Sequence, residues 1–166
     1  MIDDRVGLGI DFHRLVASRP LVLGGVVVPS ENGLLGHSDA DVLVHAVCDA
    51  LLGAAGLGDV GVHYPDSDER FRGISSLRLL DDVVGKVRRA GYEVANVDAT
   101  VVAEQPRLAA HFPAMRTNLA RTLGIEETYV NLKATTSETM GALGRGEGMA
   151  AWAVCLIRTS ARCRDT

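Results

Sequence analysis

The segment that most constrains the fold is a nearly unbroken apolar run, MAAWAVCLIR, at residues 149–158. A strand that lacks polar alternation is typical of the interior of a sheet covered on both faces. We therefore expect this strand to be buried on both sides. The helices of the chain would cover one face of its sheet. The other face also needs a cover, which another subunit would supply.

Further strands follow from apolar and polar residues that alternate, or from short apolar runs beside glycines. They are expected at residues 5–15, 21–23, 26–28, 94–103 and 129–136. Gly7 and Gly9 weaken the first of these predictions, because glycine is unfavourable inside a strand. The second and third strands form a small hairpin that turns at Gly24 and Gly25.

Three helices are expected, at residues 41–56, 76–90 and 113–123. The first would be N-capped by Ser38 or Asp39 and the second by Ser75 or Ser76, because these side chains accept hydrogen bonds from free helix N–H groups. The predicted fold is an α+β two-layer sandwich: a mixed β-sheet of about four main strands with three helices on one face, plus the small hairpin. No repeat or linker divides the chain, so we expect one domain over residues 1–166.

Composition narrows the possible partners. Hydrophobic residues make up 47% of the 166 and charged residues 23%, so the chain can bury a sizeable core. The 17 Lys and Arg against 21 Asp and Glu leave a net charge of −4. Binding to nucleic acid or to an anionic membrane needs clustered cations, and none occur here. We therefore expect neither partner.

The cysteines and the N-terminus bear on location. Cys48, Cys155 and Cys163 are odd in number and form no C-x-x-C pair, which disfavours a disulfide framework or a cysteine zinc site. The chain begins with acidic residues where a signal peptide is basic and apolar, and its apolar runs are too short to span a membrane. These features predict a cytoplasmic protein.

The sharpest chemical feature is Asp11-x-His13 on the first strand. Residues two apart on a strand point to the same face, close enough to bind one cation. The alternative is a surface alternation in which Phe12 points inward and both polar side chains face water. An unpaired Asp and His would be costly to bury, so the choice depends on what lies opposite them.

A polar line along the helix at 41–56 favours the first alternative. Asp41, His45 and Asp49 lie one turn apart on a helix that is otherwise almost entirely apolar. A lone histidine there is usually a hydrogen-bonded core residue. A histidine flanked by carboxylates can instead be a metal ligand whose tautomer a neighbour holds. Asp11, His13 and His45 would then form a three-ligand set with an open fourth position, as in catalytic zinc sites.

Other polar clusters occur at residues 37–41 (HSDAD), 64–68 (YPDSD), 133–138 (KATTSE) and 144–148 (GRGEG). His37 and Ser38 could bind a phosphate at a helix N-terminus, or could belong to a simple N-cap. The second cluster suits sugar hydroxyls or a metal, and equally an exposed turn. In the third, Thr135 and Glu138 also fit a capping box. The fourth is not a phosphate-binding Walker loop, although its glycines could let Arg145 approach a phosphate or a neighbouring subunit.

Taken in order, these segments resemble the 2-C-methyl-D-erythritol 2,4-cyclodiphosphate synthase family of the non-mevalonate isoprenoid pathway. The resemblance covers nearly the whole chain and rests on residues 9–13 (GIDFH), 36–41 (GHSDAD), 49–61 (DALLGAAGLGDVG), 63–68 (HYPDSD), 98–108 (DATVVAEQPRL), 130–138 (VNLKATTSE) and 144–151 (GRGEGMAA). Several ordered motifs are far more specific than any one of them. Leu15 and Ala142 depart from the pattern, since aromatic residues are common at both positions.

The resemblance implies a zinc ion held by Asp11, His13 and His45. It implies a second divalent cation, Mg²⁺ or Mn²⁺, at Glu138, and places His37 and Thr136 against the phosphates as catalytic residues. The implied reaction is intramolecular: the 2-phosphate of 4-diphosphocytidyl-2-C-methyl-D-erythritol 2-phosphate attacks the β-phosphorus, closes the cyclic diphosphate and expels CMP.

The resemblance also implies the substrate contacts and the assembly. The residues implied for the methylerythritol and phosphate portion are Ser38, Asp59, Gly61, Tyr64, Pro65, Asp66, Ser67, Asp68 and Arg145. Those implied for the cytidine nucleotide are Ala103, Glu104, Gln105, Pro106, Arg107, Leu108 and Thr135. The family is a homotrimer with its sites at subunit interfaces, which would supply the missing cover of the sheet.

Two other functions remain open at this stage. A mononuclear zinc hydrolase would use the same three ligands to activate water, but it needs a general base that the sequence does not identify. A non-catalytic trimeric ligand-binding module would share the fold without the reaction.

Overall fold

A computed structural model describes residues 4–160. Cys163 and the first three residues, on which parts of the predictions above rest, lie outside this range. The central five-stranded sheet has the order β4-β1-β7-β5-β6. Its strands are β1 (Asp4–Ala17), β4 (Asn32–Leu34), β5 (Tyr92–Val102), β6 (Val130–Thr135) and β7 (Gly148–Thr159). Only β5 and β6 run parallel, so the sheet is mixed as predicted. Strand β4 is the one that the prediction of about four main strands missed, because three residues carry too little pattern.

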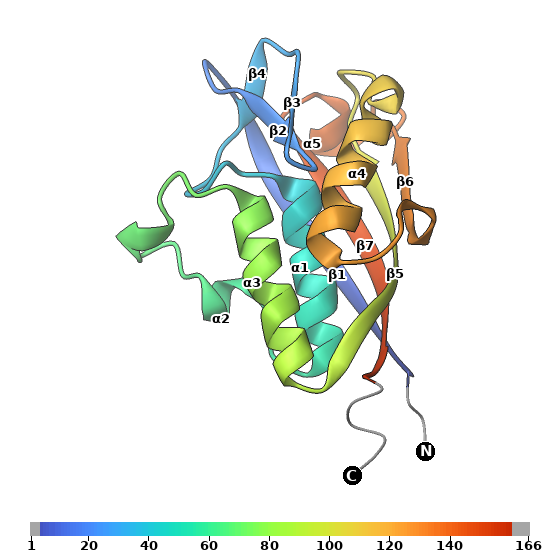
Figure 1. The fold of residues 1–166 in the computed structure, drawn as a ribbon. Helices are drawn as coiled ribbons and strands as arrows, with labels where there is room; N and C mark the ends of the chain where they lie inside the picture. The colour runs from blue at the N-terminus through green and yellow to red at the C-terminus, as the bar shows by residue number, and fades with distance from the viewer. Residues whose placement is uncertain (1–3, 161–166) are drawn as a thin grey trace.

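Three helices cover one face of the sheet: α1 (Val42–Ala55), α3 (Ser76–Arg89) and α4 (Phe112–Leu123) (Figure 1). Their bounds lie within one or two residues of the prediction. The hairpin of β2 (Leu21–Leu23) and β3 (Val26–Val28) forms a separate two-stranded sheet and turns at the expected glycines. The short elements are α2 (Val60–His63), η1 (Glu69–Phe71), η2 (Ala109–His111), η3 (Glu127–Tyr129) and α5 (Gly141–Gly144).

The N-cap of α1 is Asp41, not the predicted Ser38 or Asp39. Asp41 is fully buried and has an extended backbone, and its carboxylate accepts hydrogen bonds from Val44 N at 3.1 Å and Gly25 N at 2.7 Å. The same side chain therefore caps the helix and ties it to the β2–β3 turn. Sequence spacing could not reveal the second contact, since Gly25 is distant in the chain.

Helix α1 lies directly against β1 because two glycines leave room for it. A Cβ atom added at Gly7 would lie 1.9 Å from Ala50 O, and one added at Gly9 would lie 1.9 Å from Ala46 O. The two glycines that weakened the strand prediction are thus what allows the helix and strand backbones to approach so closely. This close approach decides which residues of α1 can contact β1.

The second face of the sheet carries an open strip of apolar side chains. Leu8 of β1 pairs with Val154 of β7, and Ile10 with Trp152. Leu8 is 59% exposed and Val154 43% exposed. Within residues 4–160 no second layer covers this face, so burial of the 149–158 strand on both sides would need the cover that was expected from another subunit.

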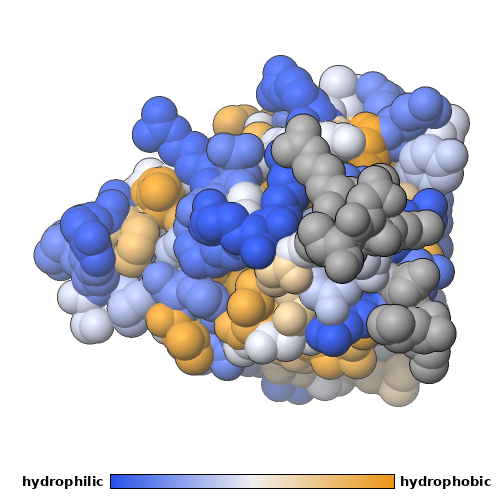
Figure 2. Space-filling view, turned by 60° about the horizontal axis from the view of Figure 1, so that its bottom comes forward, coloured by the Kyte–Doolittle hydropathy of each residue, from blue (hydrophilic) through white to orange (hydrophobic). Residues whose placement is uncertain are grey.

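On the face of the molecule drawn in Figure 2, hydrophilic and apolar side chains are intermixed. Within residues 4–160, no helix combines the length and the apolar character needed to span a membrane. Cys48 and Cys155 are buried and free.

Candidate metal centre and substrate cavities

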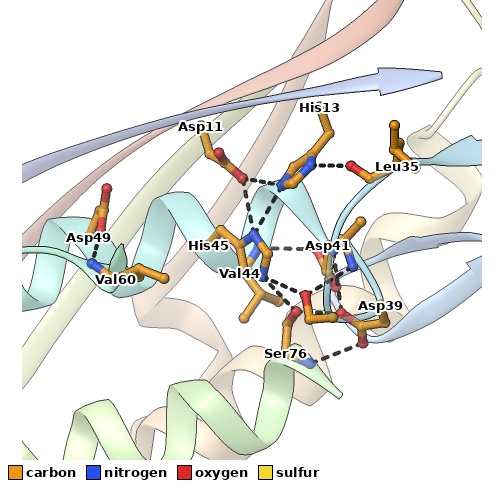
Figure 3. Close-up of polar contacts among 12 residues, drawn as sticks. Asp11, His13, Leu35, Asp39, Asp41, Val44, His45, Asp49, Val60 and Ser76 are labelled. Atoms are coloured by element: carbon orange, nitrogen blue, oxygen red, sulfur yellow. Dashed lines mark hydrogen bonds and ion pairs between the residues drawn. The ribbon is translucent and has the colours of Figure 1, made fainter. Parts of the chain in front are cut away.

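Asp11, His13 and His45 converge at one point between β1 and α1 (Figure 3). Asp11 Oδ2 lies 2.9 Å from His13 Nε2 and 3.1 Å from His45 Nδ1, and the two ring nitrogens are 3.2 Å apart. The neighbour of the two β1 ligands, Phe12, points to the open face and is 58% exposed. The alternative in which Phe12 faces inward and the polar pair faces water is therefore wrong.

The three ligand atoms have the dimensions of a divalent metal site. A tetrahedral zinc ion with bonds of about 2.0–2.1 Å holds its ligand atoms about 3.3 Å apart. The observed triangle is only slightly tighter, so one ion above its plane would reach all three atoms and keep a fourth position open. One carboxylate and two imidazoles are also a donor set that suits zinc. The residues present therefore fit the ion.

Each imidazole is held by hydrogen bonds on the side away from the cluster. His13 Nδ1 donates to Leu35 O at 2.6 Å, which leaves Nε2 facing the cluster. His45 Nε2 lies 2.9 Å from Ser76 Oγ and 3.2 Å from Ser38 Oγ. Partners of this kind orient metal-binding histidines.

The expected carboxylate partners of His45 lie elsewhere. Asp41 caps α1, as described above, and Asp49 Oδ1 accepts a hydrogen bond from Val60 N at 2.7 Å. Both carboxylates satisfy backbone donors and leave His45 to the serines. The prediction missed Ser76, whose position at the start of α3 indicated only a helix cap.

Charge within the cluster favours ionised Asp11. Burial opposes its ionisation, but the contacts with His13 and His45 outweigh burial and lower the pKa of Asp11 well below its usual value. Burial likewise disfavours charged His13, yet its contact with Asp11 raises the pKa of His13 overall. The carboxylate is thus available as an anionic ligand at neutral pH.

The cluster opens into a cavity of about 440 Å³. Predicted residues that line it, besides the three ligands, are His37, Ser38, Gly61, Tyr64, Pro65 and Asp66. Three residues predicted from the 59–68 loop do not line it: Asp59 caps α2 through Val62 N, Asp68 pairs with Arg70, and Ser67 is exposed on the same loop. Phe71 and Leu79 line the cavity although the sequence did not indicate them.

A second hollow, of about 520 Å³, is lined by every residue that was predicted to bind the nucleotide. Those residues are Ala103, Glu104, Gln105, Pro106, Arg107, Leu108 and Thr135. Thr136 and Glu138 line it as well. Arg145 lines neither hollow and pairs with Glu147 at 2.6 Å on the surface.

The two hollows share no lining residue. Residues paired across the four successive strands β1, β7, β5 and β6 give the distance between them. Phe12 pairs with Ala150, Ala150 with Val102, and Val102 with Thr135. Three strand spacings of about 4.8 Å therefore separate the β1 backbone beside the metal cluster from Thr135, or roughly 14 Å. Within one chain, Asp11 and His13 on β1 therefore lie well apart from Thr135 on β6, although they lie near the same end of the sheet.

The turn that carries Glu138 has an unusual backbone. Glu138 and Thr139 are consecutive non-glycine residues with positive φ, 54° and 61°. Such backbone geometry costs free energy and persists only where neighbours enforce it. Glu104 supplies this support, since Glu104 Oε1 accepts hydrogen bonds from Ser137 N at 2.8 Å and Ser137 Oγ at 2.9 Å. These donors lower the pKa of Glu104.

Replacing Glu104 with alanine is expected to weaken binding in the second hollow through this turn. Without the carboxylate, the strained residues relax and Glu138 loses its position. This should lower the affinity for CMP with Mg²⁺, the ligands that the family resemblance implies here, about tenfold, a typical effect of removing a residue that supports a ligand. Titration calorimetry of the variant measures this. Glu31→Ala, which removes an exposed carboxylate beside β4, is the matched control. Unchanged CMP affinity in Glu104→Ala would contradict the proposed support of the Glu138 turn by Glu104.

The fold and the site define the class: an α+β protein with a three-ligand centre of the kind that holds a catalytic divalent metal, next to a substrate-sized cavity. Comparison with known proteins makes this specific. Residues 4–158 match the YgbB family, and the chain belongs to that family.

The curated relatives carry one enzyme name. The 2-C-methyl-D-erythritol 2,4-cyclodiphosphate synthase of Desulforamulus reducens is 59% identical over 93% of this chain and 98% of its own length. The synthase of Desulfosudis oleivorans is 61% identical over 92% of this chain and 91% of its own length. At these identities over nearly full length, the chain is an enzyme of the cyclodiphosphate synthase type.

Solved structures share the fold. The bifunctional IspDF of Campylobacter jejuni is 44% identical with a TM-score of 0.91; the match covers 95% of this chain but only 42% of that larger one. A CDP complex of IspF from Plasmodium falciparum is 27% identical with a TM-score of 0.84, over 96% of this chain and 99% of that one.

Proposed function

We propose that the chain converts 4-diphosphocytidyl-2-C-methyl-D-erythritol 2-phosphate into 2-C-methyl-D-erythritol 2,4-cyclodiphosphate and CMP in isoprenoid biosynthesis by the non-mevalonate pathway. The observation that carries the proposal is the Asp11–His13–His45 triangle at the wall of the 440 Å³ cavity. The names of the relatives, and the CDP-bound form of one of the similar structures, support the same substrate class.

The reaction needs positioning more than a protein nucleophile. An oxygen of the 2-phosphate forms a bond to the β-phosphorus, and the bond from that phosphorus to the oxygen bridging to the α-phosphate breaks, so that CMP leaves with that oxygen. Because attacker and target belong to one molecule, holding it folded can supply about 7–11 kcal/mol of the barrier. No group of this chain has to form a covalent intermediate.

The residues have distinct proposed roles. Asp11, His13 and His45 would hold zinc, and Glu138 would hold Mg²⁺ or Mn²⁺; these ions would offset the charge of the approaching phosphates. His37 and Thr136 would donate hydrogen bonds to phosphate oxygens and so polarise them.

The remaining site residues would bind the two ends of the substrate. Ser38, Arg145 and the loop from Asp59 to Asp68 would hold the methylerythritol portion and its phosphate. The segment from Ala103 to Leu108, with Thr135, would hold the cytidine nucleotide. The second hollow contains all of the latter group.

We also propose that the working site forms between two copies of the chain in a homotrimer. The zinc residues and the nucleotide residues lie in separate hollows of one chain, and a neighbouring copy can bring one copy's metal cluster to the other's nucleotide hollow. The open apolar strip on β1 and β7 supports such an assembly, since contiguous exposed apolar surface marks interaction sites. The buried free thiols of Cys48 and Cys155 suit a reducing cytoplasm.

Changing Leu8 to aspartate is expected to dissociate the trimer, because it would bury a charge without a partner on the open face of the sheet. The monomer should keep its fold, since Leu8 is already exposed there. Sedimentation analysis should give three chain masses for the parent and one for the variant. Val27→Asp, at a 67% exposed hairpin residue away from this face, should stay trimeric. A trimeric Leu8→Asp variant would refute the proposed interface.

Product analysis tests the proposed reaction directly. The purified chain, loaded with Zn²⁺ and Mg²⁺, is incubated with the cytidyl substrate, and the products are identified by ³¹P NMR. CMP with the cyclic diphosphate supports the synthase. CMP with a linear product indicates the zinc hydrolase, and binding without release of CMP indicates the ligand-binding module.

A further inference from the structure

The side of His45 that faces away from the metal cluster contacts two serines. His45 Nε2 lies 2.9 Å from Ser76 Oγ, at the start of α3 (Figure 3). It lies 3.2 Å from Ser38 Oγ, in the segment before α1. Ser76 is fully buried. A hydroxyl can donate to a ring nitrogen or accept from it, so this contact alone does not determine which ring nitrogen carries the proton.

Asp39 determines the direction of that hydrogen bond. Ser76 Oγ donates to Asp39 Oδ1 in a short hydrogen bond, and Ser76 N donates to Asp39 Oδ2 at 3.0 Å. An ionised carboxylate only accepts, so the single hydroxyl proton of Ser76 points to Asp39. Toward His45, Ser76 can therefore only accept. Since Ser76 Oγ is nearer to His45 Nε2 than Ser38 Oγ is, this favours the ring proton on Nε2.

We infer that Asp39, acting through Ser76, is a positioning group that holds His45 in its metal-binding tautomer. A neutral imidazole with its proton on Nε2 presents a lone pair at Nδ1, the atom 3.1 Å from Asp11 Oδ2 and 3.2 Å from His13 Nε2. The same logic holds for His13, whose Nδ1 faces the acceptor-only carbonyl of Leu35. The inference rests on the proposed metal site and adds a residue that does not itself touch the metal.

The arrangement also ties the site to the fold. Asp39 precedes α1 and Ser76 begins α3, so their contact joins the ends of the two helices behind the cluster. A change at Asp39 should therefore affect metal binding without removing any ligand atom.

Asp39→Asn is the sharpest test because it keeps size and shape. The amide oxygen would accept from Ser76 N, which places the amide NH₂ against Ser76 Oγ. Ser76 would then accept from the amide and donate to His45 Nε2, which favours the proton on Nδ1 and blocks the metal lone pair. We expect the zinc affinity, measured by competition with a chromophoric chelator, to fall about 10–100-fold.

Two further variants and one spectroscopic readout complete the experiment. Ser76→Ala removes the acceptor and should also weaken zinc binding, whereas Ser75→Ala, at an exposed serine without a side-chain capping bond, should not. In the zinc-loaded protein, ¹H–¹⁵N NMR should show a slowly exchanging Nε2 proton on His45 in the parent and in Ser75→Ala. That proton should exchange markedly faster in Ser76→Ala and Asp39→Asn.

The outcomes separate the two levels of the proposal. If the parent chain binds no zinc, the proposed metal site fails and the inference fails with it. If the parent binds zinc while folded Asp39→Asn and Ser76→Ala keep both its affinity and its proton protection, only the positioning role is overturned. Weakened binding with faster exchange in both variants, and in neither control, supports it.

Discussion

Replacing His45 with alanine is expected to abolish zinc binding and reduce turnover by roughly 10³-fold, because metal stabilisation of phosphate charge is worth several kcal/mol. His45 is the one ligand that α1 contributes, and its loss leaves only the two β1 ligands. The proposed trimer should persist, because the change leaves the open apolar strip on β1 and β7 intact. Metal analysis of the purified variant, with CMP release from the cytidyl substrate, measures both effects.

His111→Ala is a matched control for this change. His111 lies in η2 and lines neither of the two hollows, so its removal should leave metal content and turnover close to those of the parent. A His45→Ala protein that is free of zinc and fully active would refute the metal assignment. Retained zinc with lost activity would instead indicate that His45 acts on the substrate.

Replacing Gly9 with alanine is expected to destabilise the fold by about 3 kcal/mol, at the upper end of overpacking effects. The added Cβ would lie 1.9 Å from Ala46 O, and the obstacle is helix backbone that no rotamer change can move. Helix α1 must retreat until ordinary contact, near 3.4 Å, is restored. Because His45 precedes Ala46, this movement should also open the metal triangle. Chemical denaturation and zinc titration measure the two consequences.

Gly53→Ala provides the matched control on α1 itself. Gly53 is exposed in the helix interior, and an added Cβ there meets nothing within 4 Å. The same substitution should therefore stabilise the protein by about 0.5–1 kcal/mol, because alanine is the better helix former. If Gly9→Ala were as stable as the parent, the close approach of α1 and β1 would not be required for folding.

Local patterns predicted most of the secondary structure. The β2–β3 hairpin turns at Gly24 and Gly25 as expected, and α4 ends at Leu123 before Gly124. The errors have one kind of cause. Strand β4 is stabilised only by pairing with β1, and the N-cap of α1 moved to Asp41 because that side chain also binds Gly25. Both depend on partners distant in the chain.

For the candidate site too, the sequence identified some residues, and only the structure showed the others. The spacing Asp11-x-His13 and the position of His45 on an apolar helix were readable from the sequence, and the structure brings these three together. The roles of Ser76 and Asp39 were not readable, because the start of α3 indicates only a helix cap. From the sequence, Gly9 was interpreted as weakening β1. In the structure, the same glycine is what allows α1 to pack directly against that strand.

By itself, the sequence determined the element order, the ligand types and the family resemblance, since these depend on residue identity and on spacings of a few residues. Only the tertiary structure decided that Phe12 faces out, that α1 approaches β1 at glycines, and that the zinc and nucleotide residues occupy separate hollows. Those features depend on sheet register and on close packing between distant segments. The sequence determines the chemistry of each side chain, but the packing of the layers determines which partner that side chain contacts.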